Sequence, residues 1–168
     1  MSGVITDNIG RSSGLIKAAD AAGKVKQIIM KDATAVTEDS TNFSGYKAGT
    51  IGDIGTAHIS QAITPTDASS IIYVIANSAA GLESNSLSGA AIFAGSTCKA
   101  YMTNNGYSVD GSGFCIHAAW VAGSTSAVTV EFRSIGSYIG SQTKLGTMHA
   151  DGDATTPIGT MTIMEVLN

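Results

Sequence analysis

The stretch that most constrains the fold of this chain lies at residues 63–77, where a turn leads into its most continuous apolar run. The residues at 71–75 are all β-branched or aromatic, a composition typical of a strand buried on both faces. Pro65 fixes its φ angle and lacks an N–H group, and Asp67 can bond its own backbone, so the chain can turn into this strand. A buried helical segment is the alternative, but no 3.6-residue periodicity extends the run. The stretch therefore predicts a central core strand.

The composition favours strands over helices in the rest of the chain. The 168 residues include 20 glycines and only 13% charged side chains, which suits short strands joined by tight turns. We expect the first strand to lie at a sheet edge, the last to lie inside a sheet, and residues 31–56 and 101–107 to form loops, the former with room for a short strand. The fold class expected is all-β, an antiparallel, jelly-roll-like β-sandwich. Apolar patterns predict about eight strands, at residues 24–30, 57–63, 71–77, 90–94, 114–121, 127–133, 137–145 and 159–167.

The first 23 residues differ from the remainder and predict a separate N-terminal arm, followed by a β-sandwich domain at 24–168. The arm is polar and glycine-spaced, and its Ala-rich segment at 15–22 could make two helical turns that are too short to be stable alone. We expect an arm that becomes ordered only against a partner; a frayed terminus without a role is the alternative. The candidate attachment residues are Ile5, Ile9, Arg11, Leu15 and Ile16.

Charge and hydropathy exclude two classes of partner. The net charge is −4, and residues 48–168 carry three Lys/Arg against eight Asp/Glu, which argues against a nucleic-acid-binding surface. No apolar run approaches the roughly 20 residues that a membrane span needs, so we expect no membrane insertion. The first residues also lack the basic and then apolar pattern of a signal peptide.

No motif in the chain points to a reaction. It contains no nucleophile elbow, no Walker loop and no dinucleotide-binding glycine motif between a strand and a helix. Asp151 and Asp153 lack the further ligands of a calcium loop and predict a turn instead. Cys98 and Cys115 are expected as two buried thiols, or as a bridge if their strands are neighbours. We expect no metal, no cofactor and no enzymatic activity, since three histidines stand in no metal-ligand spacing: His58, His117 and His149.

Several segments in order resemble a β-sandwich domain that is common in structural proteins of tailed bacteriophages. The resemblance covers about residues 23–168, and residues 2–15 are similar to the start of many small proteins from aquatic phages. The chain departs from the family pattern at Ile71 and Ala94, where basic residues are common. The segments that carry the resemblance are GKVKQII at 23–29, ITPTDASSIIYV at 63–74, AIFAGST at 91–97, SAVTVEFR at 126–133 and MTIMEV at 161–166.

The resemblance implies a virion component that is assembled in the host bacterial cytoplasm. It implies a homotrimeric knob that either decorates the capsid or belongs to a tail appendage, with other virion proteins as partners and the arm as the anchor. The alternative is a tail fibre tip that binds a receptor or a host surface glycan. Aromatic side chains on Asn- and Gly-rich loops suit sugar stacking, with simple loop anchors as the alternative, and the candidates are Tyr46, Tyr101 and Tyr107.

Overall fold

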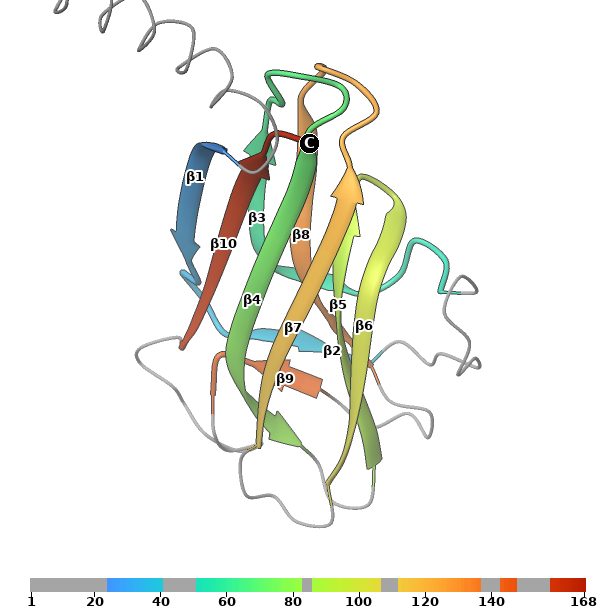
Figure 1. The fold of residues 1–168 in the computed structure, drawn as a ribbon. Coiled ribbons are helices and arrows are strands. Elements are labelled where there is room, and N and C mark those ends of the chain that lie inside the picture. The colour runs from blue at the N-terminus through green and yellow to red at the C-terminus, as the bar shows by residue number, and fades with distance from the viewer. Residues whose placement is uncertain (1–23, 41–50, 83–85, 107–111, 137–142, 148–157) are drawn as a thin grey trace, which may run out of the picture.

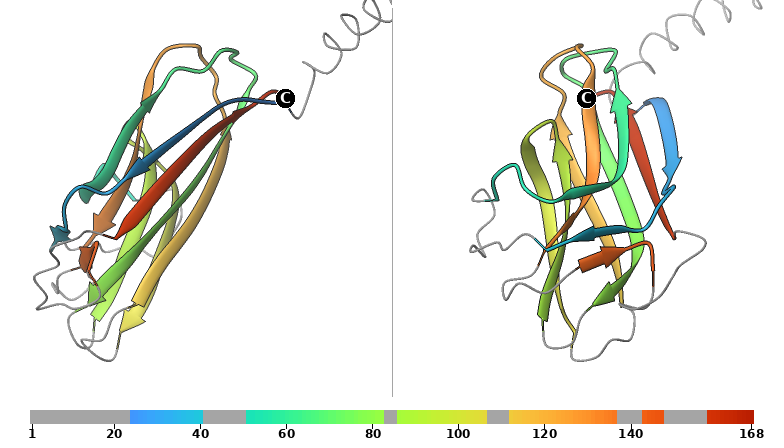
Figure 2. Two further views of the ribbon diagram at one scale, coloured as in Figure 1. Left: turned by 90° about the vertical axis from the view of Figure 1, so that its left-hand side faces the viewer. Right: turned by 180° about the vertical axis from the view of Figure 1, so that it is seen from behind.

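The computed structural model describes residues 24–40, 51–82, 86–106, 112–136, 143–147 and 158–168, and this part of the chain is all-β. Its strands are antiparallel and form two sheets that pack face to face (Figures 1 and 2). The strands are β1 (Val25–Asp32), β2 (Thr37–Asp39), β3 (Thr56–Ile63), β4 (Ile71–Leu82), β5 (Ser86–Ala94), β6 (Thr97–Gly106), β7 (Ser112–Val121), β8 (Val128–Ile135), β9 (Thr143–Leu145) and β10 (Gly159–Val166).

The eight longer strands follow a jelly-roll order. The first sheet contains β1, β10, β4 and β7 side by side, and the second sheet contains β3, β8, β5 and β6. Among these eight strands the chain crosses between the sheets after β1, β3, β4, β6, β7 and β8, which gives the two interlocked antiparallel motifs of a jelly roll. The short strands β9 and β2 extend the first sheet at the far end of β4. The expected sandwich is therefore confirmed, with β6 as a long strand that the sequence-based expectation did not include.

Strand β4 is the central strand that the sequence predicts. It pairs with β10 on one side and with β7 on the other, and its last residues pair with β9. Only one of its faces is fully buried, however: Ile72, Val74 and Ala76 are 0% exposed, whereas the alternate residues Ile71, Tyr73 and Ile75 are half-buried. The expectation of burial on both faces is wrong for this reason, because only one side of the strand has a second sheet against it.

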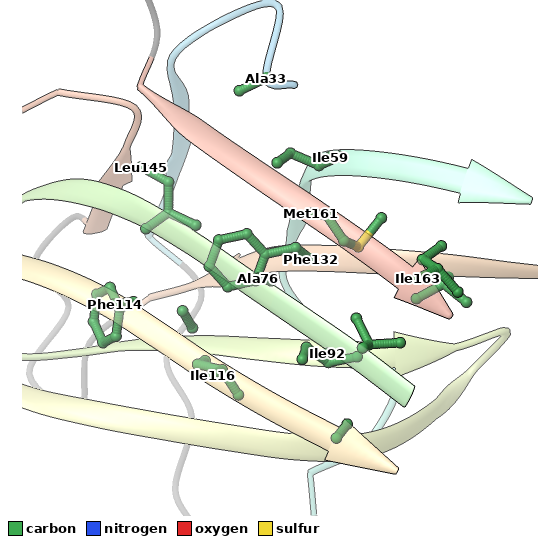
Figure 3. Close-up of a cluster of buried hydrophobic side chains, with 14 of the residues drawn as sticks. Ala33, Ile59, Ala76, Ile92, Phe114, Ile116, Phe132, Leu145, Met161 and Ile163 are labelled. Atoms are coloured by element: carbon green, nitrogen blue, oxygen red, sulfur yellow. The ribbon is translucent and has the colours of Figure 1, made fainter. Parts of the chain in front are cut away.

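The core lies between the two sheets and is built from inward-facing side chains of both (Figure 3). The first sheet contributes alternate residues of β4, β7 and β10, among them Phe114, Ile116 and Ile163. The second sheet contributes Ile92 and Phe132, both 0% exposed. Period-two alternation along each strand is the pattern that places these residues on one side.

The positions of the first and last predicted strands are confirmed. Strand β1 lies at an edge of the first sheet, and its inward residues Gln27 and Ile29 are half-buried while Ile28 and Met30 point outward. Strand β10 lies between β1 and β4, with every second residue buried. The sheet is therefore closed by segments that are far apart in the sequence.

Three details differ from the sequence-based expectation. Residues 101–106 belong to strand β6 rather than to a loop, because pairing with β5 continues from the turn at Gly95 as far as Gly106. Of the expected strand at 137–145, β9 is the described part, and residues 137–142 lie outside the described residues. Strand β4 also continues to Leu82, beyond the predicted end at residue 77. The described residues contain no helix of the length and hydropathy needed to cross a membrane.

Candidate functional site: the open face of the first sheet

The outer face of the second sheet is covered by the chain itself. Its outward side chains Ala91, Phe93 and Ile135 are at most 1% exposed, because Ile51 and Ile54 of the segment before β3 pack over them. These contacts form a second, smaller apolar cluster outside the main core. This face therefore leaves little apolar surface for a partner.

An ion-pair network completes the same face. The Arg133 guanidinium lies 2.6 Å from Asp53 Oδ1 and 2.6 Å from Glu131 Oε2, and 4.1 Å above the centre of the Phe93 ring. It also donates a hydrogen bond to the Ile54 carbonyl oxygen. The arginine thus ties the covering segment to strand β8.

The outer face of the first sheet is different, because no described segment covers it and its charged residues are confined to edge strand β1, at Lys26 and Asp32. Over β10, β4 and β7 its outward positions carry no Asp, Glu, Lys or Arg. Edge strand β1 adds Ile28 and Met30, which are 58% and 72% exposed, and Val121 at the other side is 57% exposed. We call this surface the open face; its positions on β10, β4 and β7 are Thr160, Thr162, Met164, Val166, Ile71, Tyr73, Ile75, Asn77, Cys115, His117, Ala119 and Val121.

A cluster of three reactive side chains lies on the open face. The Tyr73 hydroxyl is 2.9 Å from His117 Nδ1, and Cys115 Sγ is 3.6 Å from His117 Nε2. The pairing of β4 with β7 places Tyr73 opposite Ala119, next to His117. Cys115 is exposed and Cys98 is half-buried, and both are free thiols, so the expectation of two buried thiols is wrong. The cause is the alternation of β7, which points Cys115 away from the core.

This cluster joins a soft sulfur donor, an imidazole and a phenol within hydrogen-bonding range of one another. A thiol and an imidazole can act together as a nucleophile and a base, or as two ligands of a metal ion. The described residues contain no group of three or more His, Cys, Asp or Glu side chains that could hold a metal. Any further ligand in a metal site would therefore come from water, from outside the described residues or from another molecule.

A second histidine, His58 of β3, is buried inside the sandwich. Its Nδ1 atom is 3.1 Å from Thr37 Oγ1, and its Nε2 atom is 3.2 Å from Ser78 Oγ. Burial lowers the pKa of His58 to about 4, against a smaller opposing effect of its hydrogen bond with the Ile158 backbone. The Ser78 hydroxyl is within 2.8 Å of the carbonyl oxygens of Ala79 and Ile158, to which it can donate. This group therefore links the two sheets, and it does not present an exposed nucleophile.

Sequence reasoning missed the role of Glu165, whose carboxylate is 0% exposed. It accepts hydrogen bonds from Gln27 Nε2 at 2.6 Å, from the Thr66 backbone N–H at 2.7 Å and from the Thr66 hydroxyl at 2.8 Å. Burial by itself raises the pKa of Glu165, but the hydrogen bonds from Gln27 and Thr66 outweigh it and lower the pKa to about 2. The signal available in the sequence was an acidic residue at an inward position of an alternating strand.

The Glu165 contacts connect three segments that carry the phage resemblance. Gln27 lies in the first of these segments, Thr66 in the turn before β4, and Glu165 in the last strand. The carboxylate satisfies donors of the turn that no strand partner reaches. The three segments therefore meet at the Glu165 carboxylate, where their contacts stabilise the fold.

The other candidate residues from the sequence are not brought together by the described structure. Tyr101 is in β6, half-buried, and packs against the apolar cluster under the covering segment. Its role in ligand binding stays a prediction, as do those of Tyr46 and Tyr107, which lie outside the described residues. Also outside them are His149, the turn at 151–153 and the five attachment candidates Ile5, Ile9, Arg11, Leu15 and Ile16.

Comparison with known proteins gives no assignment: no family model matches the chain, and no curated protein matches it.

Proposed function

We propose that this chain is a non-enzymatic structural protein of a bacteriophage particle. In this proposal the β-sandwich is displayed on the particle surface, as a capsid decoration protein or a tail appendage. Residues 1–23 anchor it, and three copies associate through the open face. The jelly-roll fold and the placement of the resembling segments on β1, β4, β5, β8 and β10 support this choice of class.

The open face is the observation that carries the proposal. A sheet exposed to water normally alternates apolar inward and polar outward residues. Here the outward residues of β4 are Ile71, Tyr73 and Ile75, and edge strand β1 adds the exposed Ile28 and Met30. The outer face of the second sheet shows that this chain covers apolar surface where it can. A face that carries charge only on its edge strand and has no such cover favours association with another protein surface.

The size of the open face indicates that it does not act alone. Four strands about 4.8 Å apart and seven residues rising about 3.3 Å each span about 19 Å by 23 Å, or about 440 Å². Stable complexes bury about 800 Å² on each partner. Further surface of the β-sandwich must therefore contribute to the association.

The solution mass of the purified full chain tests the association. We expect light scattering to give three times the 17.0 kDa of one chain. Substituting two well-exposed positions of the open face, Met30→Glu and Val121→Glu, should shift the mass towards that of one chain, because the charges would be desolvated at the interface. Met102→Glu is the matched control, since Met102 is 42% exposed on β6 of the other sheet.

Two outcomes would contradict this association. One is a wild-type protein with the mass of a single chain at the highest soluble concentration. The other is a Met102→Glu variant that dissociates as fully as the open-face variant.

The virion assignment and the arm are tested on particles of the phage that encodes the chain. An antibody against the β-sandwich should label intact particles in electron micrographs. A variant lacking residues 1–22 should keep its solution mass but should fail to enter particles. Unlabelled particles would remove the virion assignment, and unchanged incorporation of the truncated variant would remove the anchoring role of the arm.

A further inference from the structure

Two side chains on the open face have the chemistry and the spacing of metal ligands. Cys115 and His117 are alternate residues of β7, so both point outward from the first sheet, and both are exposed. Cys115 Sγ and His117 Nε2 are 3.6 Å apart. The strand alternation that predicts their common face also brings the two donor atoms together.

The separation of these two atoms fits a tetrahedral zinc ion. Typical bonds are about 2.3 Å for zinc to sulfur and about 2.0–2.1 Å for zinc to nitrogen. At a tetrahedral angle of about 109°, two such bonds place sulfur and nitrogen about 3.6 Å apart. No rearrangement of the strand is therefore needed to bind the ion between them.

Tyr73 holds the imidazole in the orientation that such binding needs. Its hydroxyl oxygen is 2.9 Å from His117 Nδ1, and the two rings meet edge to face with centroids 6.1 Å apart. When Nδ1–H donates to this oxygen, Nε2 keeps its lone pair and faces the sulfur. A hydrogen bond of this kind on the second ring nitrogen is the usual support of a histidine that binds a metal.

We propose that Cys115 and His117 form a two-ligand chelate for Zn²⁺ on the open face, with Tyr73 as the positioning residue. The described residues supply no third ligand. The remaining positions of the ion are filled by water, or by the same two side chains of another copy. The second source needs two copies paired about a twofold axis, which is a contact distinct from the three-copy association proposed above, whereas the chelate itself needs neither.

Zinc binding to the full-length protein, reduced and freed of metal with a chelator, tests the proposal. A competition titration with a coloured zinc indicator gives the affinity. We expect at least a tenfold loss in affinity for Cys115→Ser and for His117→Gln. We expect a loss of about tenfold or more for Tyr73→Phe, the range seen when a supporting hydrogen bond is removed. Cys98→Ser is the matched control, because Cys98 is the other free thiol and lies on β6, and its affinity should stay unchanged.

Cys115 and His117 are exposed, so their substitution leaves the core intact, and melting temperatures measured without zinc check that each variant is folded. The Tyr73→Phe variant separates positioning from packing, since it keeps the ring and loses only the hydroxyl. The proposal is overturned if the wild type binds zinc no more tightly than the Cys115→Ser/His117→Gln double variant. It is also overturned if Cys98→Ser loses as much affinity as Cys115→Ser.

The light-scattering mass, measured with and without zinc, identifies what completes the site. One zinc per chain at constant mass supports the chelate with water in the open positions. Less than one zinc per chain, with a mass that rises on addition of zinc, supports the chelate completed by another copy. If the protein does not bind zinc, the mass measured without metal is unaffected. The zinc site and the self-association of the protein can therefore be refuted independently of each other.

Discussion

Replacing the buried carboxylate of Glu165 by an amide should destabilise the protein and change how its stability depends on pH. In Glu165→Gln the side chain keeps its size but loses its charge. An amide NH2 group, which donates hydrogen bonds, also replaces one of the two carboxylate oxygens, which accept them. Gln27 Nε2 already donates to Thr64 O at 2.8 Å as well as to the carboxylate, so turning the Gln27 amide to accept from the new amide would lose the first of these bonds.

The size of the effect follows from the pKa of Glu165. Hydrogen bonds to the charged form lower this pKa from 4.5 to about 2, against the opposing effect of burial. A tenfold difference in proton affinity corresponds to about 1.4 kcal/mol, so the native environment favours the charged carboxylate by about 3 kcal/mol. Since the folded-state pKa is the lower one, this stabilisation is complete above pH 4.5 and is lost as the pH falls towards 2.

Urea denaturation at equal protein concentration measures the effect. Glu165→Gln should be about 3 kcal/mol less stable than the wild type at pH 7, and the difference should shrink steadily between pH 4.5 and pH 2. Glu38→Gln is the control, because Glu38 is an exposed carboxylate that pairs with Lys144 at 3.5 Å, and it should cost at most about 1 kcal/mol. A Glu165→Gln effect below that of the control, or one that is constant down to pH 2, would refute the reasoning.

Three further predictions concern the core between the sheets. Burial lowers the pKa of His58 from 6.5 to about 4, so wild-type stability should fall by about 3 kcal/mol as the pH decreases across this window, and urea midpoints of His58→Gln should lack this slope. Gly159→Ala would place a methyl group 2.7 Å from His58 Nε2 and should cost about 1–3 kcal/mol in urea denaturation. Gly113→Ala has its nearest neighbour at an ordinary 3.5 Å and should change stability by less than about 0.5 kcal/mol. Phe132→Ala removes a ring that is 0% exposed and should lower the free energy of unfolding by about 3–5 kcal/mol, measured in the same way.

Much of the fold could be predicted because its main strands carry clear local patterns. The β-branched run at 71–75 marks β4, and period-two alternation marks β7. Strand β6 carries no such pattern: Lys99, Asn104 and Asn105 have low strand propensity, and pairing with β5 decides their conformation. Local sequence shows only what a segment prefers, and the partner strand decides the rest.

The candidate site was harder to predict because it depends on which strands are neighbours. The sequence places Cys115 and His117 on one face of a strand, but Tyr73 precedes them by about forty residues. Only the antiparallel register of β4 with β7 brings its hydroxyl to the imidazole. Similarly, nothing in the run at 71–75 states that one of its faces lacks a covering layer, since that depends on the position of the second sheet. Apolar residues on both faces of a strand therefore predict that both faces are buried. They do not show whether the covering surface belongs to the same chain or to another molecule.

The position of β10 between β1 and β4 has a consequence for how the protein is made. Strands β1 and β4 hydrogen-bond to β10, and not to each other, in the first sheet. A ribosome adds about 5–20 residues per second, so β1 waits on the order of 10 s for the residues of β10 to be synthesised. During that time both strands have unpaired edges, which are the edges most prone to wrong pairing between nascent chains. A polysome that makes many copies close together would therefore be the place where misassembly of this protein begins.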